Sequence, residues 1–162
     1  MRAALVLLLV AAAGTAQAAG AQDMVLGRMV ASRADAPSVA VTTHARAHYV
    51  LHCAGCHGVA GGGAPEKYVP GLQQLGLFLN VPGGREFVIS VPGVMGSGLD
   101  DEQVAEVANW LLATMAKDSV PAGHRPYTTA EVTQARAKPL VDVAAERARL
   151  VERARAAGIK IK

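Results

Sequence analysis

The residues best suited to chemistry are two cysteines and a histidine, which stand together as Cys53-Ala54-Gly55-Cys56-His57. Two residues between the thiols place both sulfurs within about one helical turn. This spacing allows two thioether bonds to the vinyl groups of one haem. The imidazole that follows the second cysteine then lies under the iron as its proximal ligand. We therefore predict one covalently attached haem c, with Cys53 and Cys56 as attachment points and His57 as a metal ligand.

A Cys-x-x-Cys pair alone is also compatible with a disulfide or with a thioredoxin-like redox site. Three features favour haem over these alternatives. The histidine is in place, the N-terminus has an export pattern, and the chain shows almost none of the apolar–polar alternation of the strands that a thioredoxin-like site needs. A structural zinc site would need two further ligands, and both cysteines of the chain lie in this pentapeptide.

The N-terminus has the pattern of a bacterial export signal. Met1-Arg2 gives a positive start, residues 3–13 form an apolar run, and Ala16-Gln17-Ala18 is a small-x-small cleavage site. The run is shorter than the roughly 20 apolar residues that cross a bilayer. We therefore predict a signal peptide over 1–18, a soluble mature protein without a stable membrane anchor, and a location in the periplasm, where bacteria attach haem.

The pentapeptide and its surroundings resemble the c-type cytochromes over about residues 43–117. Tyr49 stands four residues before Cys53, where the family often carries an aromatic residue, and a glycine loop at 61–63 follows the pentapeptide. The resemblance implies an all-α, cytochrome c-like helical domain around one haem. We place this domain at 43–120.

Two further residues receive roles from this resemblance. The carbonyl of Pro70 would accept the Nδ1–H of His57, which fixes the ring orientation of the ligand. Met95 lies in a glycine-rich loop at 91–98, where the family presents the thioether that binds iron as the sixth ligand, and such His/Met ligation raises the reduction potential. The family commonly has proline after this methionine and this chain has Gly96, so an open site, a water or a histidine are the alternatives.

The remaining histidines are less suited to the iron. His44, His48 and His52 are four residues apart and form one stripe on the first expected helix. Such a stripe is typical of a solvated helix face, with a surface metal site as the alternative. His124 would reach the iron only if the tail folds back across the haem.

Helical spacing predicts the elements that position the site. A short helix is expected over 83–91, ahead of Met95. A longer one opens at Asp100, which can cap it with Gln103 at the third position. Its expected apolar face consists of Val104, Val107, Ala108, Leu111, Leu112 and Met115, with Trp110 at the edge.

The last part of the chain differs in charge from the rest. Residues 125–162 carry nine Lys and Arg against four Asp and Glu, whereas residues 19–124 carry six against nine. The positive charge is therefore concentrated in the tail. We divide the chain into the signal peptide, an N-terminal lead at 19–42, the haem domain and a basic helical extension at 121–162.

Two helices are expected in this extension. A capping box from Thr128 to Glu131 begins the first, which must end near Pro139. The second is expected over 140–157, with Gly158 as its stop. The extension either wraps the body and ends in a solvated basic face, or forms a docking element for a dehydrogenase or oxidase.

These observations predict a periplasmic monohaem c-type cytochrome that carries single electrons between redox partners, such as a dehydrogenase and an oxidase or reductase. We do not expect an enzyme, since a carrier need only hold the iron, set its potential and expose a haem edge to its partners. Nucleic-acid binding is not expected either, because no basic block with interleaved aromatics occurs. The alternatives are a five-coordinate haem protein that binds a gas or peroxide, and a haem subunit held permanently on a larger dehydrogenase.

Overall fold

The computed structural model describes the backbone of residues 39–162 and the side chains from residue 42 onward. The expected signal peptide at 1–18, and the lead at 19–42 apart from its last residues, lie outside this part of the chain. All the described residues belong to one compact unit. The expected haem domain at 43–120 and the extension at 121–162 therefore share that unit.

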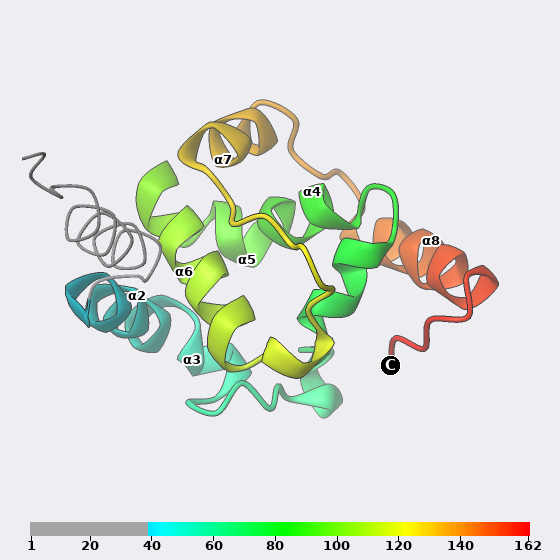
Figure 1. The fold of residues 1–162 in the computed structure, drawn as a ribbon, viewed down its shortest axis with the longest axis horizontal. Coiled ribbons are helices and arrows are strands. Elements are labelled where there is room, and N and C mark those ends of the chain that lie inside the picture. Colours follow the sequence, from blue (N-terminus) through cyan, green and yellow to red (C-terminus); the bar gives the residue numbers. More distant parts are fainter. Residues whose placement is uncertain (1–38) are drawn as a thin grey trace, which may run out of the picture. The chain divides into compact units, whose positions relative to one another are not determined.

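The described residues form helices, and a single antiparallel bridge joins Ala64 to Val69 (Figure 1). This confirms the expected all-α fold. No helix within residues 39–162 is both long enough and apolar enough to cross a membrane. The α-helices are α2 (Val39–His52), α3 (Ala54–His57), α4 (Gly84–Ser90), α5 (Pro92–Met95), α6 (Asp101–Thr114), α7 (Thr129–Arg136) and α8 (Val143–Ala156), and the 3-10 helices are η1 (Pro65–Lys67), η2 (Leu75–Asn80) and η3 (Lys117–Ser119).

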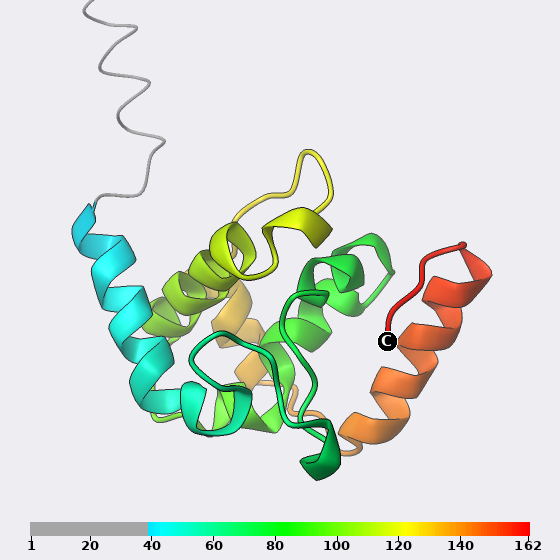
Figure 2. The ribbon, with the colours of Figure 1, turned by 90° about the horizontal axis from the view of Figure 1, so that it is seen from below.

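Helices α2 and α6 pack against each other in the body of the protein (Figures 1 and 2). Tyr49 of α2 is fully buried, and its ring centroid lies 5.4 Å from that of Trp110 on α6. The expected apolar face of α6 is buried, while Met115, just after the helix, is half-buried. The buried residues of α6 are Val104, Ala105, Val107, Ala108, Leu111 and Leu112.

The start of α6 is fixed by the expected capping box. The backbone N–H of Gln103 donates to Oδ1 of Asp100 at 2.8 Å, and the backbone N–H of Asp100 donates to Oε1 of Gln103 at 3.0 Å. These bonds satisfy N–H groups that have no partner within the helix. The cap therefore fixes the point at which the segment after Met95 enters α6.

The first helix of the extension follows the sequence prediction. Thr128 and Glu131 form the expected capping box, and α7 begins after it. The helix ends at Arg136, ahead of Pro139, which has no N–H to continue the helical ladder.

The second helix of the extension is shorter than expected. The sequence predicted a start at residue 140, but α8 begins at Val143 because Oδ1 of Asp142 accepts the backbone N–H of Ala145 at 2.9 Å and caps the helix there. The helix ends at Ala156. The chain then leaves the helical path at Gly158, whose φ of 78° suits glycine.

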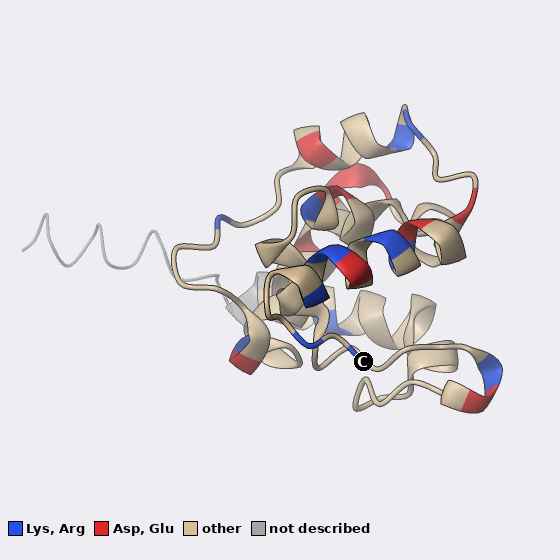
Figure 3. Ribbon diagram, turned by 90° about the vertical axis from the view of Figure 1, so that its right-hand side faces the viewer, with Lys and Arg blue, Asp and Glu red and all other residues tan. Residues whose placement is uncertain are grey.

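Both helices of the extension lie on the body. Helix α7 packs against α6 and α4, and α8 packs against α4 and η2, at the opposite end of the unit from α2 (Figures 1 and 2). Val132 on α7 and Leu150 and Ala154 on α8 are fully buried. Arg and Glu both occur along α8 (Figure 3). With four Arg against two Glu, α8 is net positive, and the solvated basic face stays a prediction.

Candidate haem site

The two cysteines lie on consecutive turns at the end of α2. The backbone N–H of Cys53 still bonds the carbonyl of Tyr49 at 2.9 Å, and the N–H of His57 bonds the carbonyl of Cys53 at 3.0 Å. Cys53 is half-buried and Cys56 is exposed, and both thiols are free. One short stretch of backbone thus carries both thiols and the imidazole, as the spacing of the pentapeptide implies.

Burial raises the pKa of the Cys53 thiol, and the neighbouring Cys56 raises it further. Burial disfavours the thiolate because the charged form loses solvation. Cys53 therefore remains a protonated thiol at neutral pH.

Tyr49 ties the end of the pentapeptide to α2. Its hydroxyl donates to the carbonyl of Gly58 at 2.5 Å. Burial raises the pKa of this phenol, so it stays protonated and keeps donating. Gly61 follows with a φ of 70°, and a Cβ at this position would lie 2.7 Å from Sδ of Met115. A side chain at Gly61 would therefore displace Met115 and strain the backbone at this positive φ.

His57 is oriented by the contact that the sequence predicted. Its Nδ1 lies 3.0 Å from the carbonyl oxygen of Pro70. A carbonyl only accepts, so Nδ1 carries the proton in this contact and Nε2 keeps a free lone pair. The loop is held by further backbone bonds, from the N–H of Gly63 to the carbonyl of His57 at 2.9 Å and from the N–H of Leu72 to the carbonyl of Gly61 at 2.8 Å. The imidazole is thus presented in the tautomer that binds a metal through Nε2.

Met95 lies in a different local structure from the one expected. The sequence predicted a loop, but Met95 is the last residue of the short helix α5, which Pro92 begins at its first position. Proline suits that position because its fixed φ is helical and its missing N–H needs no partner. The backbone N–H of Met95 bonds the carbonyl of Val91 at 3.0 Å, and the side chain is half-buried against the core.

The segment from Met95 to Leu99 carries contacts that sequence reasoning missed. Nδ1 of His52 lies 2.8 Å from the carbonyl oxygen of Ser97, and the guanidinium of Arg136 donates to the carbonyls of Met95 and Leu99 at 3.2 and 2.6 Å. All three acceptors are backbone oxygens. No side chain on the segment marks them, so the sequence holds no local signal for these bonds.

The other histidines fall into different environments. His44 is exposed, in agreement with a solvated stripe, but His48 is half-buried and its Nδ1 has no hydrogen-bond partner among the described residues. His124 lies in the extension, where its ring meets that of Tyr127 edge-on at 6.2 Å. Burial lowers the pKa of His124, and the nearby guanidinium of Arg85 lowers it further. The structure therefore groups His124 with residues of the tail.

The surroundings of the pentapeptide fit a flat apolar group held by thiols and an imidazole. In the described part of the chain, five large hydrophobic side chains are exposed, and three of them flank the pentapeptide, namely Val50, Leu51 and Val59. Each of the three stands within three residues of the pentapeptide in the sequence. Together with the free thiols and the free Nε2 of His57, they form a donor set and a surface suited to haem c.

Comparison with known proteins supports this interpretation. No family model matches the chain. It is 34% identical over 118 residues to a cytochrome c-552 of Thermus thermophilus, an alignment that covers 60% of this chain and 90% of that protein. A second cytochrome c-552 of Thermus thermophilus is also 34% identical over 118 residues, with 60% of this chain and 80% of that protein covered. The chain belongs to the c-type cytochromes. Membership of this family agrees with the helical fold and implies a haem c as cofactor.

Proposed function

We propose that this c-type cytochrome is a periplasmic electron carrier with one haem c, attached through Cys53 and Cys56 and ligated by His57 and Met95. The contact between Nδ1 of His57 and the carbonyl of Pro70 carries this proposal. It fixes the tautomer and the orientation that an iron ligand requires, in the residue next to the two thiols. The similarity to two proteins named cytochrome c-552 supports the same function.

The thiols provide the covalent link. Cys53 and Cys56 would hold the haem through two thioether bonds, each made by addition of an S–H across a vinyl double bond with no leaving group. The bound haem iron supplies the one-electron chemistry. The apolar side chains of Val50, Leu51 and Val59 would exclude water near the attachment point. A lower dielectric there would strengthen electrostatic interactions with nearby charges.

Met95 is proposed as the sixth ligand on the strength of its anchoring. Its side chain is half-buried and the backbone on both sides of it is hydrogen-bonded, to Val91 before it and to Arg136 at its own carbonyl. A thioether held in this way favours a closed, six-coordinate carrier over an open haem that binds a gas or peroxide. His/Met ligation also favours a raised reduction potential.

A free carrier is supported over a permanently bound subunit by the way the extension is used. Two of its apolar side chains, Val132 and Leu150, are fully buried in the chain's own core, together with Tyr127, which is 4% exposed. An extension that served mainly to hold a larger enzyme would be expected to keep an apolar face for it. The partners proposed here are a dehydrogenase and an oxidase or reductase that meet the carrier transiently.

The ligand assignment is tested by Met95→Ala in protein produced with its haem attached. We expect the sulfur-to-iron charge-transfer band of the oxidised protein to disappear and carbon monoxide to bind the reduced protein rapidly. The control is Met115→Leu, since Met115 is the other half-buried methionine of the described chain and lies against Gly61. An unchanged band in Met95→Ala, or rapid carbon monoxide binding by the unaltered protein, would contradict the proposal.

A further inference from the structure

The backbone between α5 and α6 is held from two sides. Its alternate carbonyls, those of Met95, Ser97 and Leu99, all accept hydrogen bonds from outside the segment. His52 at the end of α2 bonds the middle carbonyl, and Arg136 at the end of α7 bonds the outer two. Because Arg136 comes from the C-terminal extension, the extension reaches the proposed sixth ligand through a single side chain.

Arg136 uses all three nitrogens of its guanidinium at this point. Nη1 donates to the carbonyl of Met95 at 3.2 Å and Nη2 to the carbonyl of Leu99 at 2.6 Å, while Nε forms an ion pair with Oδ1 of Asp101. Thr133, one turn earlier on α7, donates its hydroxyl to the other carboxylate oxygen of Asp101. The Thr133 hydroxyl and the Arg136 guanidinium hold the pKa of Asp101 below its ordinary value. The carboxylate therefore stays charged and keeps the guanidinium in place.

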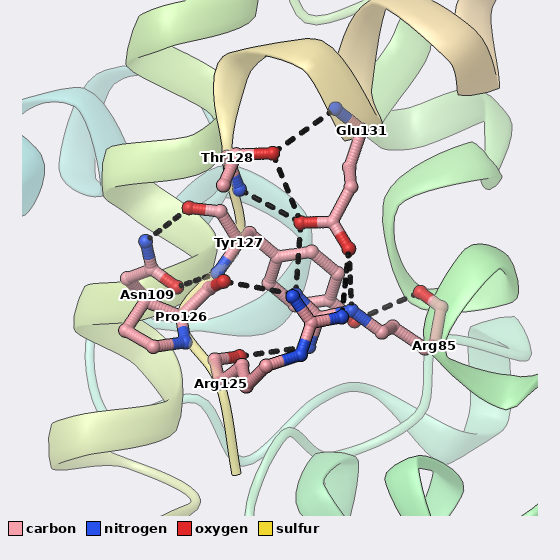
Figure 4. Close-up of polar contacts among 7 residues, drawn as sticks. All are labelled: Arg85, Asn109, Arg125, Pro126, Tyr127, Thr128 and Glu131. Carbon is pink, nitrogen blue, oxygen red and sulfur yellow. Dashed lines mark hydrogen bonds and ion pairs between the residues drawn. The ribbon is translucent and has the colours of Figure 1, made fainter.

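The other end of α7 is also fixed to the body, as Figure 4 shows. Arg85 on α4 forms a two-point contact with the carboxylate of Glu131, at 2.7 and 2.9 Å. Asn109 on α6 exchanges two bonds with the backbone of Tyr127, at 2.7 and 2.9 Å. With its start secured in this way, α7 presents Arg136 to the Met95 segment from a rigid support.

We propose that Arg136 is a positioning residue that holds the Met95–Leu99 segment in its closed arrangement and so resists loss of the sixth ligand. This inference rests on the proposed role of Met95 as that ligand. Because Arg136 bonds the carbonyl of Met95, a backbone movement that would carry the Met95 side chain away from a haem iron would have to break that bond. The guanidinium fork suits this task, because its geometry is planar and fixed, and it reaches two carbonyls and a carboxylate at once.

Imidazole added to the oxidised protein measures this resistance, because it binds the iron only after the sixth ligand leaves. We expect Arg136→Gln to bind imidazole about tenfold more tightly than the unaltered protein, given that two charge-assisted hydrogen bonds are lost. Arg136→Lys should show a smaller gain in imidazole affinity, since an ammonium keeps the charge near Asp101 but is a point charge without the fork. It also provides a variant closer to the native protein if Arg136→Gln folds poorly.

Arg85→Gln is the matched control. Arg85 anchors the same extension through Glu131 and the carbonyls of Arg125 and Pro126, and none of these hydrogen bonds involves the Met95–Leu99 segment. It should lower the melting temperature while leaving imidazole affinity within about twofold. Equal gains in imidazole affinity for Arg85→Gln and Arg136→Gln would overturn the inference, because general loosening would then explain both.

The two proposals fail in different ways. If Met95→Ala keeps the sulfur-to-iron band, the ligand assignment itself is wrong. If Met95→Ala loses the band but Arg136→Gln and Arg136→Lys both bind imidazole as the unaltered protein does, Met95 is the ligand and Arg136 does not position it.

Discussion

The two helices of the extension are attached to the same body in different ways. Helix α7 is joined by directional polar contacts in addition to buried side chains, and Arg85, Asn109 and Tyr127 all take part in these contacts (Figure 4). Helix α8 is joined mainly by apolar side chains, with Leu150 and Ala154 fully buried. Hydrogen bonds fix angles and distances, whereas apolar burial mainly fixes proximity. The contrast indicates that α7 positions other residues and that α8 chiefly covers the core.

The polar contacts from α8 and from the residues after it agree with this contrast, because each is a single hydrogen bond. Arg153 donates to the carbonyl of Pro82 at 3.1 Å, and the backbone N–H of Lys162 donates to Oε1 of Gln74 at 2.9 Å. The ion pair of Glu152 with Arg155 lies within the helix and is exposed on both sides. Exposed pairs of this kind contribute little to stability.

Removing the side chain of Tyr127 should weaken the attachment of α7 and have the largest effect on the free energy of unfolding. Its ring is 4% exposed and lies 4.1 Å from the guanidinium carbon of Arg85, and its hydroxyl donates to the carbonyl of Arg85 at 2.8 Å. We expect Tyr127→Ala to lower the free energy of unfolding by about 4 kcal/mol, as measured by denaturant titration. Tyr127→Phe, which keeps the ring, should cost only about 1 kcal/mol. Equal losses for the two variants would show that packing of the ring is not what holds α7.

Leu150→Ala should weaken the attachment of α8 and have the next largest effect on the free energy of unfolding. The side chain is fully buried, so we expect a loss of about 3 kcal/mol in the free energy of unfolding, from lost transfer energy and the cavity left behind. The contrast between α7 and α8 also predicts how this substitution affects ligand binding. Imidazole affinity of the oxidised protein should stay unchanged in Leu150→Ala, and a rise comparable to that of Arg136→Gln would remove the distinction between the two helices.

The smallest effect is expected from the ion pair at the start of α7, and it should depend on pH. The side-chain hydrogen bond from Arg85 lowers the pKa of Glu131 to about 2, from an ordinary value of 4.5. A carboxyl with a depressed pKa stabilises the folded state above its unfolded pKa, and this stabilisation is lost as pH falls toward the folded pKa. Glu131→Gln should therefore cost about 1 kcal/mol at pH 7, a modest loss because solvent partly screens the pair.

The difference between Glu131→Gln and the unaltered protein should shrink as pH falls from about 5 toward 2. Thermal melts at several pH values measure it. Glu152→Gln serves as the control, since Glu152 pairs with Arg155 on the exposed side of α8, and it should show almost no effect at any pH. A constant difference between the Glu131→Gln and unaltered proteins across this range would contradict the assigned role of the Arg85 pair.

The parts of the fold that follow from local chemistry were predictable from the sequence. The capping boxes at Asp100 and Thr128 and the buried face of α6 each depend on residues within a turn or two of one another. The pentapeptide is local in the same sense. The start of α8 was placed three residues too early because the apolar residues at 140 and 141 continue the helical pattern, whereas the cap at Asp142 decides the boundary.

The contacts that join distant segments were not predictable. Arg136 bonds the carbonyls of Met95 and Leu99, which precede it by 41 and 37 residues. Every residue carries a backbone carbonyl, so residue type does not identify the partner of Arg136. The packing of α7 on α6 and α4 selects it. The proposed role of Pro70 was available only because a family resemblance supplied it.

The most direct test of the account is the mass of the denatured protein after export from a bacterial host that attaches haem. We predict the mass of residues 19–162 plus one haem, and loss of the haem mass in a Cys53→Ala, Cys56→Ala double variant. A colourless product with the polypeptide mass alone, whether its thiols are free or joined to each other, would contradict the account.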